Sequence, residues 1–400
     1  MDRHGAVGGT ISSVTAMLHR IFDVFSSLKL TIVCLSLTIV LVFAGTLAQV
    51  DSGIHEVQQR YFQSLFVWWP SASGGIPVFP GGHLLGAVLL ANLIAAHARR
   101  FRWTWKKFGI HLTHAGLIIL LAGGLFTDLF SVESSMRLAP GETKNYSEDS
   151  RVMELVVIDG SDSELDQVTA IPASRLGKGG TIGHASLPFR IVVRKFYRNA
   201  RVQPLGQAGP EALPASTEGV GSRVAVFEVP RATAPNERDL PGAVIGIEPI
   251  SGGAPSPGTW LVSDQLGAPQ TFSCAGKTWR LEMRPARYYK PYSLTLRKFA
   301  HERYAGTEIP KNFASHAVLT DPERNENRDV LISMNNPLRY RGETFFQSGF
   351  EKNDTATILQ VVHNPGFLAP YVACVVVGAG LLFQFGCHFV GFLHRRGTSP

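Results

Sequence analysis

Apolar residues are concentrated in four runs along the chain, separated by segments with a different pattern. Residues 28–48, 108–130 and 367–393 are each long enough to span the hydrocarbon layer of a bilayer, which takes about 20 helical residues. The fourth run, residues 83–98, is the shortest at 16 residues, and residues 76–80 extend it at the membrane interface. It is counted as a span because, without it, the two strongly basic flanks would face opposite sides of the membrane.

Between residues 131 and 366 the pattern changes to short segments rich in Val, Ile, Thr and aromatic residues, separated by Gly, Pro, Asn and Asp. This pattern is typical of β-strands joined by turns. A Pro/Gly/Ala-rich tract near residues 201–222 predicts a flexible loop that divides the region into two halves. The sequence therefore predicts an integral membrane protein with four transmembrane helices, three before and one after a large extracytoplasmic all-β domain.

The distribution of charge predicts how the spans are oriented. The chain carries a formal charge of +7, whereas residues 131–366 hold 27 Lys/Arg and 26 Asp/Glu, a difference of +1, so the excess flanks the spans and indicates topology rather than nucleic-acid binding. A short, strongly basic turn is expected to remain in the cytoplasm. The predicted segments are a cytoplasmic N-terminal segment (1–27), helix 1 (28–48), a periplasmic loop with an amphipathic aromatic stretch (49–82), helix 2 (83–98), a basic cytoplasmic turn (99–107), helix 3 (108–130), the periplasmic β-rich domain (131–366), helix 4 (367–393) and a cytoplasmic tail (394–400).

The cysteines do not support a disulfide framework. Cys34, Cys374 and Cys387 fall within predicted helices, which leaves Cys274 alone in the outer domain, and the chain contains no CxxC motif. The first apolar run is longer than the apolar region of a signal peptide, so a retained membrane anchor is expected.

Histidines near the basic turn are the strongest candidates for chemistry. His97 closes the second span, and helical rise places His114 about 10 Å beyond the turn and His388 about 9 Å from the cytoplasmic end of the last span. An imidazole within the membrane is a functional candidate, because its burial in apolar surroundings costs free energy. The alternative is that each of these residues only touches lipid headgroups, and this alternative is strongest for His97 and for His111, which lies beside the turn.

Three imidazoles at one depth point to a haem site, because imidazole is a common axial ligand of haem iron. His97 and His114 are the candidate iron ligands, and His388 is a third candidate for the same site. The guanidinium groups of the turn suit the haem propionates, since guanidinium pairs well with carboxylate. These candidate cations are Arg99, Arg100 and Arg102.

Five stretches carry a resemblance to a known family. They are SLKLTIVCLSLTIVLVFAGTLAQ at the first span, NLIAAHARRFRWTWKKFGIHLTHAGLIILLAGG at the hairpin of spans, and YAGTEIPKNFASHAVLTD followed by LISMNNPLRYRGETFFQSGF and VVHNPGFLAPY before the last span. In these stretches, and in its plan of three spans, an outer β domain and one span, the chain resembles the ResB family of cytochrome c biogenesis proteins. Residues 160–270 match least.

The resemblance implies a function in the bacterial inner membrane. A ResB protein and its CcsA/ResC-type partner are expected to deliver haem b across the membrane and to support its attachment to the CxxCH thiols of apocytochrome c (System II). The chain lacks the partner's tryptophan-rich motif, so the resemblance implies a subunit of a holocytochrome c synthase that is not catalytic alone. The family's membrane haem ligand maps onto His97, with His114 next, and the last span contributes His388.

Two other functions fit the sequence. One is a scaffold that stabilises the partner or chaperones apocytochrome c without binding haem. The other is a quinol-reactive membrane protein with two haems, which would require a pair of histidines in each leaflet, whereas His83 is the single outer-leaflet candidate. The sequence ranks this last function below the other two.

Overall fold

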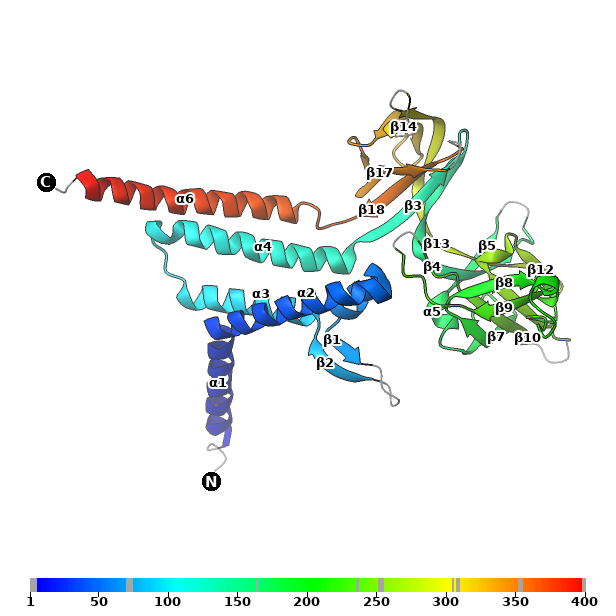
Figure 1. Cartoon of the computed structure of the whole chain (residues 1–400), viewed down its shortest axis with the longest axis horizontal. Helices are drawn as coiled ribbons and strands as arrows, with labels where there is room; N and C mark the ends of the chain where they lie inside the picture. Colours follow the sequence, from blue (N-terminus) through cyan, green and yellow to red (C-terminus); the bar gives the residue numbers. More distant parts are fainter. Residues whose placement is uncertain are drawn as a thin grey trace. The chain divides into compact units, whose positions relative to one another are not determined.

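The computed structural model describes residues 6–69, 75–162, 165–234, 237–250, 255–303, 306, 310–351 and 355–397. The chain divides into two compact units (Figure 1). The first unit comprises Met1–Val132 and Asn364–Pro400 and holds the long helices. The second unit, Glu133–His363, holds the large β-rich region that the sequence predicts.

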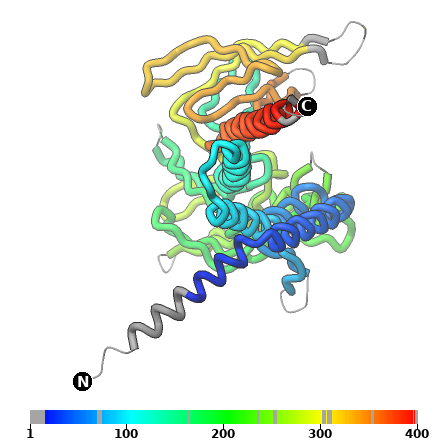
Figure 2. The backbone as a smooth tube through the Cα atoms, turned by 90° about the vertical axis from the view of Figure 1, so that its left-hand side faces the viewer, coloured from blue at the N-terminus to red at the C-terminus, as the bar shows by residue number. Residues whose placement is uncertain are grey.

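The described part of the first unit contains five α-helices: α1 (Ala6–Phe25), α2 (Leu28–Val57), α3 (Gly82–Arg100), α4 (Phe108–Phe130) and α6 (Ala369–Gly397). Helix α2 packs on α3, α3 on α4, and α4 on α6, and Figure 2 shows α6, α4 and α3 nearly end-on in that order. Helix α2 is longer than its predicted span and kinks at Gly53, whose φ of 75° suits a residue without a Cβ. A π-helical turn, Gln58–Phe62, then leads into a hairpin of β1 (Phe66–Trp69) and β2 (Ile76–Pro80).

Three of the four predicted spans lie in helices long and apolar enough to cross a membrane. These stretches are Leu28–Phe62, Trp105–Phe130 and Ala369–His394. Helix α3 does form where the fourth span is predicted, but it falls short of this criterion. The physical reason is its polar content, since His83, Asn92 and His97 interrupt the apolar run. A crossing by α3 therefore stays a prediction.

Asn92 fixes α3 against the start of α2. Its side chain is buried, accepts a hydrogen bond from Thr31 Oγ1 at 2.6 Å, and donates to the carbonyl oxygens of Phe25 and Ser27 at 2.6 and 3.1 Å. The two carbonyls lie at the end of α1 and in the turn before α2. A buried amide whose groups are satisfied in this way holds three elements together in apolar surroundings.

Helices α4 and α6 approach closely along a row of small residues. Gly109, Gly116 and Gly123 recur every seven residues on α4. A Cβ added at these positions would lie 2.5 Å from the Gly380 carbonyl oxygen, 2.5 Å from a Val377 methyl carbon and 2.3 Å from the Ala369 Cβ, respectively. Small residues that let helix backbones approach are a common means of association between apolar helices.

This packing predicts a position-specific effect on stability. In Gly380→Ala the new methyl group would meet the Gly109 carbonyl oxygen at 2.8 Å and the Thr113 amide nitrogen at 2.8 Å, so α6 must shift away from α4. We expect a loss of about 1–3 kcal/mol, measured as a lower midpoint of thermal unfolding in detergent. Gly378→Ala is the matched control, because nothing lies within 4 Å of a Cβ there. Equal midpoints for the two variants would contradict this account of the interface.

The second unit contains a ten-stranded sheet, a four-stranded sheet and a two-stranded ribbon. The ten-stranded sheet has the order β15-β14-β13-β4-β3-β18-β17-β16, with β12 paired to β13 and β5 to β4; the four-stranded sheet has the order β11-β10-β7-β6, and the ribbon is β8-β9. The strands are β3 Val132–Leu138, β4 Thr143–Asp159, β5 Gln167–Pro172, β6 Gly180–Ile182, β7 Phe189–Tyr197, β8 Ala200–Pro204, β9 Val224–Glu228, β10 Gly242–Pro249, β11 Thr259–Ser263, β12 Gln270–Cys274, β13 Lys277–Arg303, β14 Pro310–Asp321, β15 Glu326–Ser333, β16 Leu338–Tyr340, β17 Glu343–Phe350 and β18 Thr357–His363. One turn of α-helix, α5 (Ala173–Leu176), accompanies them in the described part of this unit.

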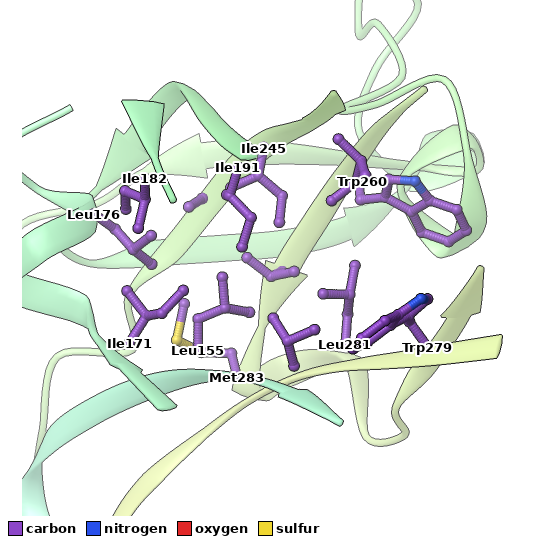
Figure 3. Close-up of a cluster of buried hydrophobic side chains, with 14 of the residues drawn as sticks. Leu155, Ile171, Leu176, Ile182, Ile191, Ile245, Trp260, Trp279, Leu281 and Met283 are labelled. Carbon is purple, nitrogen blue, oxygen red and sulfur yellow. The ribbon is translucent and has the colours of Figure 1, made fainter. Parts of the chain in front are cut away.

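Two hydrophobic cores share the longest strand, β13. Its first part contributes Trp279 and Leu281 to a core with the four-stranded sheet (Figure 3), and its later part contributes Leu294 and Leu296 to a second core with β14–β18. The register against β4 shifts between Pro285 and Arg287 and again between Tyr289 and Leu294. Proline cannot donate to a ladder and bulges bend a strand, so these shifts let one strand serve both cores.

The Pro/Gly/Ala-rich tract near residues 201–222 is not a plain loop. It includes most of β8 and two short 3₁₀ turns, Leu205–Gln207 and Gly219–Ser222. Ser216 is buried within it and accepts a hydrogen bond from the Leu261 amide at 3.1 Å. Side-chain hydrogen bonds to the neighbouring strand therefore hold a segment whose composition alone predicts a flexible loop.

Candidate functional site

Three histidine side chains meet where α3 ends and α4 begins. His97 lies in the last turns of α3, and His111 and His114 lie in the first two turns of α4. The ring centroid of His97 is 5.1 Å from that of His111 and 5.5 Å from that of His114. Residues three apart on a helix share a face, so both α4 rings reach the same place. We call these three side chains the imidazole cluster.

The hydrogen bonds of the cluster leave ring nitrogens free to bind a ligand. His114 Nδ1 lies 2.8 Å from the Ile110 carbonyl oxygen, and His111 Nε2 lies 3.1 Å from the Arg102 carbonyl oxygen. A carbonyl oxygen only accepts, so each of these nitrogens carries the proton and the other ring nitrogen keeps its lone pair. A backbone carbonyl that fixes the tautomer in this way is typical of metal-ligating histidines.

The remaining nitrogens have no competing partner. His111 Nδ1 is buried and makes no hydrogen bond within the described residues. No hydrogen bond to the His97 ring occurs in the described part of the chain either. A buried nitrogen with an unused lone pair is costly and is expected to serve a ligand.

Aromatic side chains from the basic turn cover the cluster. The Phe101 ring centroid is 4.7 Å from that of His111 and 5.7 Å from that of His97. The Trp103 ring is parallel to that of His111, at an interplanar angle of 2° and a centroid distance of 6.5 Å. Flat apolar rings beside imidazoles suit a flat, largely apolar ligand.

The predicted cations of the turn differ in their surroundings. Arg99 Nη1 pairs with Asp23 Oδ1 at 2.6 Å and donates to Ser26 Oγ at 2.7 Å, so it already joins α3 to α1. Arg100 and Arg102 are exposed, and neither forms an ion pair within the described residues. Two of the three guanidinium groups are therefore available to an anionic ligand.

The structure joins His97 with His114, as the sequence suggests, but it brings His111 rather than His388 to them. His388 lies on α6, where its Nε2 accepts a hydrogen bond from Gln384 Nε2 at 3.0 Å, and no ring contact within the described residues links it to the cluster. The sequence contained the signal for His111, since its three-residue spacing from His114 puts the two on one face of α4. The position of His111 beside the turn instead suggested a residue that only contacts lipid headgroups.

The cluster is not arranged to hold a bare metal ion. Within the described ranges, no group of three or more His, Cys, Asp or Glu side chains has the geometry to ligate one.

Comparison with known proteins finds a family likeness in one part of the chain. Residues 260–358 match the model of the ResB-like family. This part of the chain is therefore similar to ResB-like proteins. The chain is also 36% identical over 94 residues to Protein NrfI of Wolinella succinogenes. That alignment covers 24% of the present chain and 10% of NrfI, so the chain spans a small part of this curated relative.

The ResB-like match lies within the second unit, from β11 to β18. It includes the long strand β13 and most residues of the second core, and it does not include α3 or α4. The family match and the imidazole cluster are therefore independent observations on different units of the chain.

Proposed function

We propose that this ResB-like protein is a membrane subunit of cytochrome c biogenesis that handles haem b as cargo. With a CcsA/ResC-type partner it would deliver haem across the bacterial cytoplasmic membrane and support its attachment to the CxxCH thiols of apocytochrome c. The observation that carries this proposal is the imidazole cluster, which offers free ring nitrogens at the basic ends of two adjacent helices.

The cluster fits haem because the porphyrin supplies four of the iron's ligands and requires only one or two more. His97 and His114 are the proposed axial ligands. Phe101 and Trp103 would lie against the porphyrin, and Arg100 and Arg102 would pair with its propionates. His111 Nδ1, which is buried, is a further candidate ligand that the sequence did not favour.

The proposed direction of transfer follows from charge. Residues 99–107, at the end of α3 and in the turn before α4, carry five Lys/Arg and no acid, which favours a cytoplasmic location by the positive-inside rule. The cluster would then receive haem on the cytoplasmic side, and the β-rich unit would face the periplasm. Attachment itself would take place on the partner.

A scaffold without bound haem is the second candidate, and one observation favours it. The residues that match the family lie in the β-rich unit and not beside the imidazole cluster. A protein that stabilises its partner or holds apocytochrome c through this unit would show such a match. In that case substitutions in the cluster would leave cytochrome maturation intact.

The absorbance spectrum of the full-length protein tests the proposal. We expect a Soret band in protein purified in mild detergent, and a stronger band when the CcsA/ResC-type partner is co-purified. Absence of haem from both preparations, although cytochrome c matures in the same cells, would favour the scaffold.

A further inference from the structure

A cavity lies at the opposite end of α3 and α4 from the imidazole cluster. Its volume is about 480 Å³, and it is lined by the π-helical turn after α2, the start of α3 and the end of α4. Its walls are mostly aliphatic, with Leu90 from α3 and Leu120, Leu121 and Leu125 from α4. His83, at one end, is 14 residues before His97 on the same helix, about 21 Å away along its axis. The cavity is therefore separate from the proposed haem site.

Two glycines create this space. Gly86 on α3 and Gly124 on α4 both line the cavity, and nothing lies within 4 Å of a Cβ added to either. This contrasts with Gly116 of α4, where an added Cβ would meet Val377 at 2.5 Å. Gly116 serves helix packing, whereas Gly86 and Gly124 leave room for a ligand.

The end of the cavity away from the cluster carries a small polar network. His83 Nε2 forms a hydrogen bond and ion pair with Asp128 Oδ2, and Gln63 Nε2 donates to Asp128 Oδ1 at 2.7 Å. A carboxylate oxygen accepts, so Nε2 of a neutral His83 carries the proton and Nδ1 is an acceptor. Nδ1 has no hydrogen-bond partner within the described residues. The cavity thus offers an imidazole acceptor that a carboxylate orients.

We propose that this cavity binds the ring of a membrane quinone or quinol. A ligand that enters between apolar helices must be lipid-soluble. Its polar end must form hydrogen bonds with His83 and with the Gln63 side chain. A quinol hydroxyl donates to His83 Nδ1, and a quinone carbonyl accepts from the imidazolium form of the same ring. Clefts lined by apolar side chains with a few fixed polar groups are typical of such ligand sites.

The charges of the lining residues favour a quinone over a phospholipid headgroup. The residues that line the cavity include no Lys or Arg to pair with a phosphate, and Asp128 would repel one. An ammonium head would have to compete with His83 and Gln63, which already bond to the two oxygens of Asp128. A neutral ring that exchanges hydrogen bonds with an imidazole fits the network without either conflict.

The test uses the full-length protein in detergent, incubated with decylubiquinone and passed through gel filtration. We expect about one quinone per chain to remain with the wild type. Gly124→Leu should fill the cavity, and His83→Leu should remove the hydrogen bond, so the affinity of each should fall about tenfold or more, the factor that corresponds to one lost hydrogen bond of about 1.4 kcal/mol. Gly378→Leu is the matched control, because its Cβ meets open space away from the cavity.

Equal retention by all four proteins would overturn the proposal. So would extraction of a phospholipid, with no quinone, from wild type but not from Gly124→Leu, because the cavity would then be a lipid site. Haem lost specifically from Gly124→Leu would likewise reassign the cavity. The Soret band of the same preparations reports the imidazole cluster, so failure of the quinone proposal and failure of the haem proposal give different results.

Discussion

His114→Ala should abolish most haem binding. His114 has its tautomer fixed by the Ile110 carbonyl oxygen, which leaves Nε2 free for iron, and His97 lies beside it with no competing hydrogen bond in the described residues. Loss of an outer-shell partner alone costs a metal site roughly 10–100-fold, so loss of an axial ligand should reduce Soret absorbance per chain by at least about tenfold. We expect the same for His97→Ala, measured on protein purified in mild detergent.

Two controls separate ligation from folding. Free imidazole in the buffer should restore the Soret band of His114→Ala, because it can occupy the space of the deleted ring and bind the iron. His184→Ala, in the second unit, should leave the band unchanged, since His184 is exposed and its ring bonds to the nearby Ser186. An undiminished Soret band in both cluster variants would contradict ligation by this site and leave the scaffold function in place.

The helices could be read from the sequence because each apolar run is long and uninterrupted. Helix α3 is the exception, since its polar residues belong to specific contacts that hydropathy does not capture. Asn92 bonds to the α1–α2 turn, and His83 bonds to Asp128. The sequence marked Asp128 as the single acid of its span, but only the fold supplies its partners. An acid within a membrane span requires a hydrogen-bonding partner, so Asp128 itself was the sequence signal that a polar contact exists at this end of α4.

The strands were predictable as a class, whereas their boundaries were not. One apolar and aromatic stretch, TFSCAGKTWRLEMRPARYY, reads as a continuous segment, but it divides into β12 and β13 at Ala275 and Gly276, with φ of 54° and 74°. Conversely, β13 continues past Pro291, where composition predicts a break. Bulges let the strand bend without ending, and such bends depend on the two cores and not on local composition.

Buried charges on β13 were also invisible to sequence reasoning. The Lys290 side chain is 3% exposed and donates to Glu343 Oε1 at 2.5 Å, while Tyr292 Oη bonds to Glu343 Oε2. Burial, together with the hydrogen bond to Glu343, raises the pKa of Tyr292 well above its usual range, so the phenol stays a donor. These residues lie within the stretch that matches the ResB-like family.

Lys290→Met should be the most destabilising single change in the second unit that we predict. It leaves Glu343 partly buried without its cation, and breaking a buried ion pair from one side costs about 3–5 kcal/mol. The expected result is a much lower midpoint of thermal unfolding for the full-length protein. The midpoint is measured from the β-sheet signal in circular dichroism. Lys298→Met is the matched control, because this lysine is exposed on the same strand, and it should change the midpoint little.

Comparing Lys290→Met with its partner variant tests the physical cause. If an unpaired carboxylate is responsible, adding Glu343→Gln should recover part of the lost stability, because the amide needs no cation and still accepts from Tyr292. A double variant less stable than Lys290→Met would instead indicate that packing of the lysine stem dominates.

The haem content of Lys290→Met separates the two proposed functions. A haem-handling subunit whose β-rich unit is unfolded should keep its imidazole cluster and its Soret band, because every residue of that cluster belongs to the other unit.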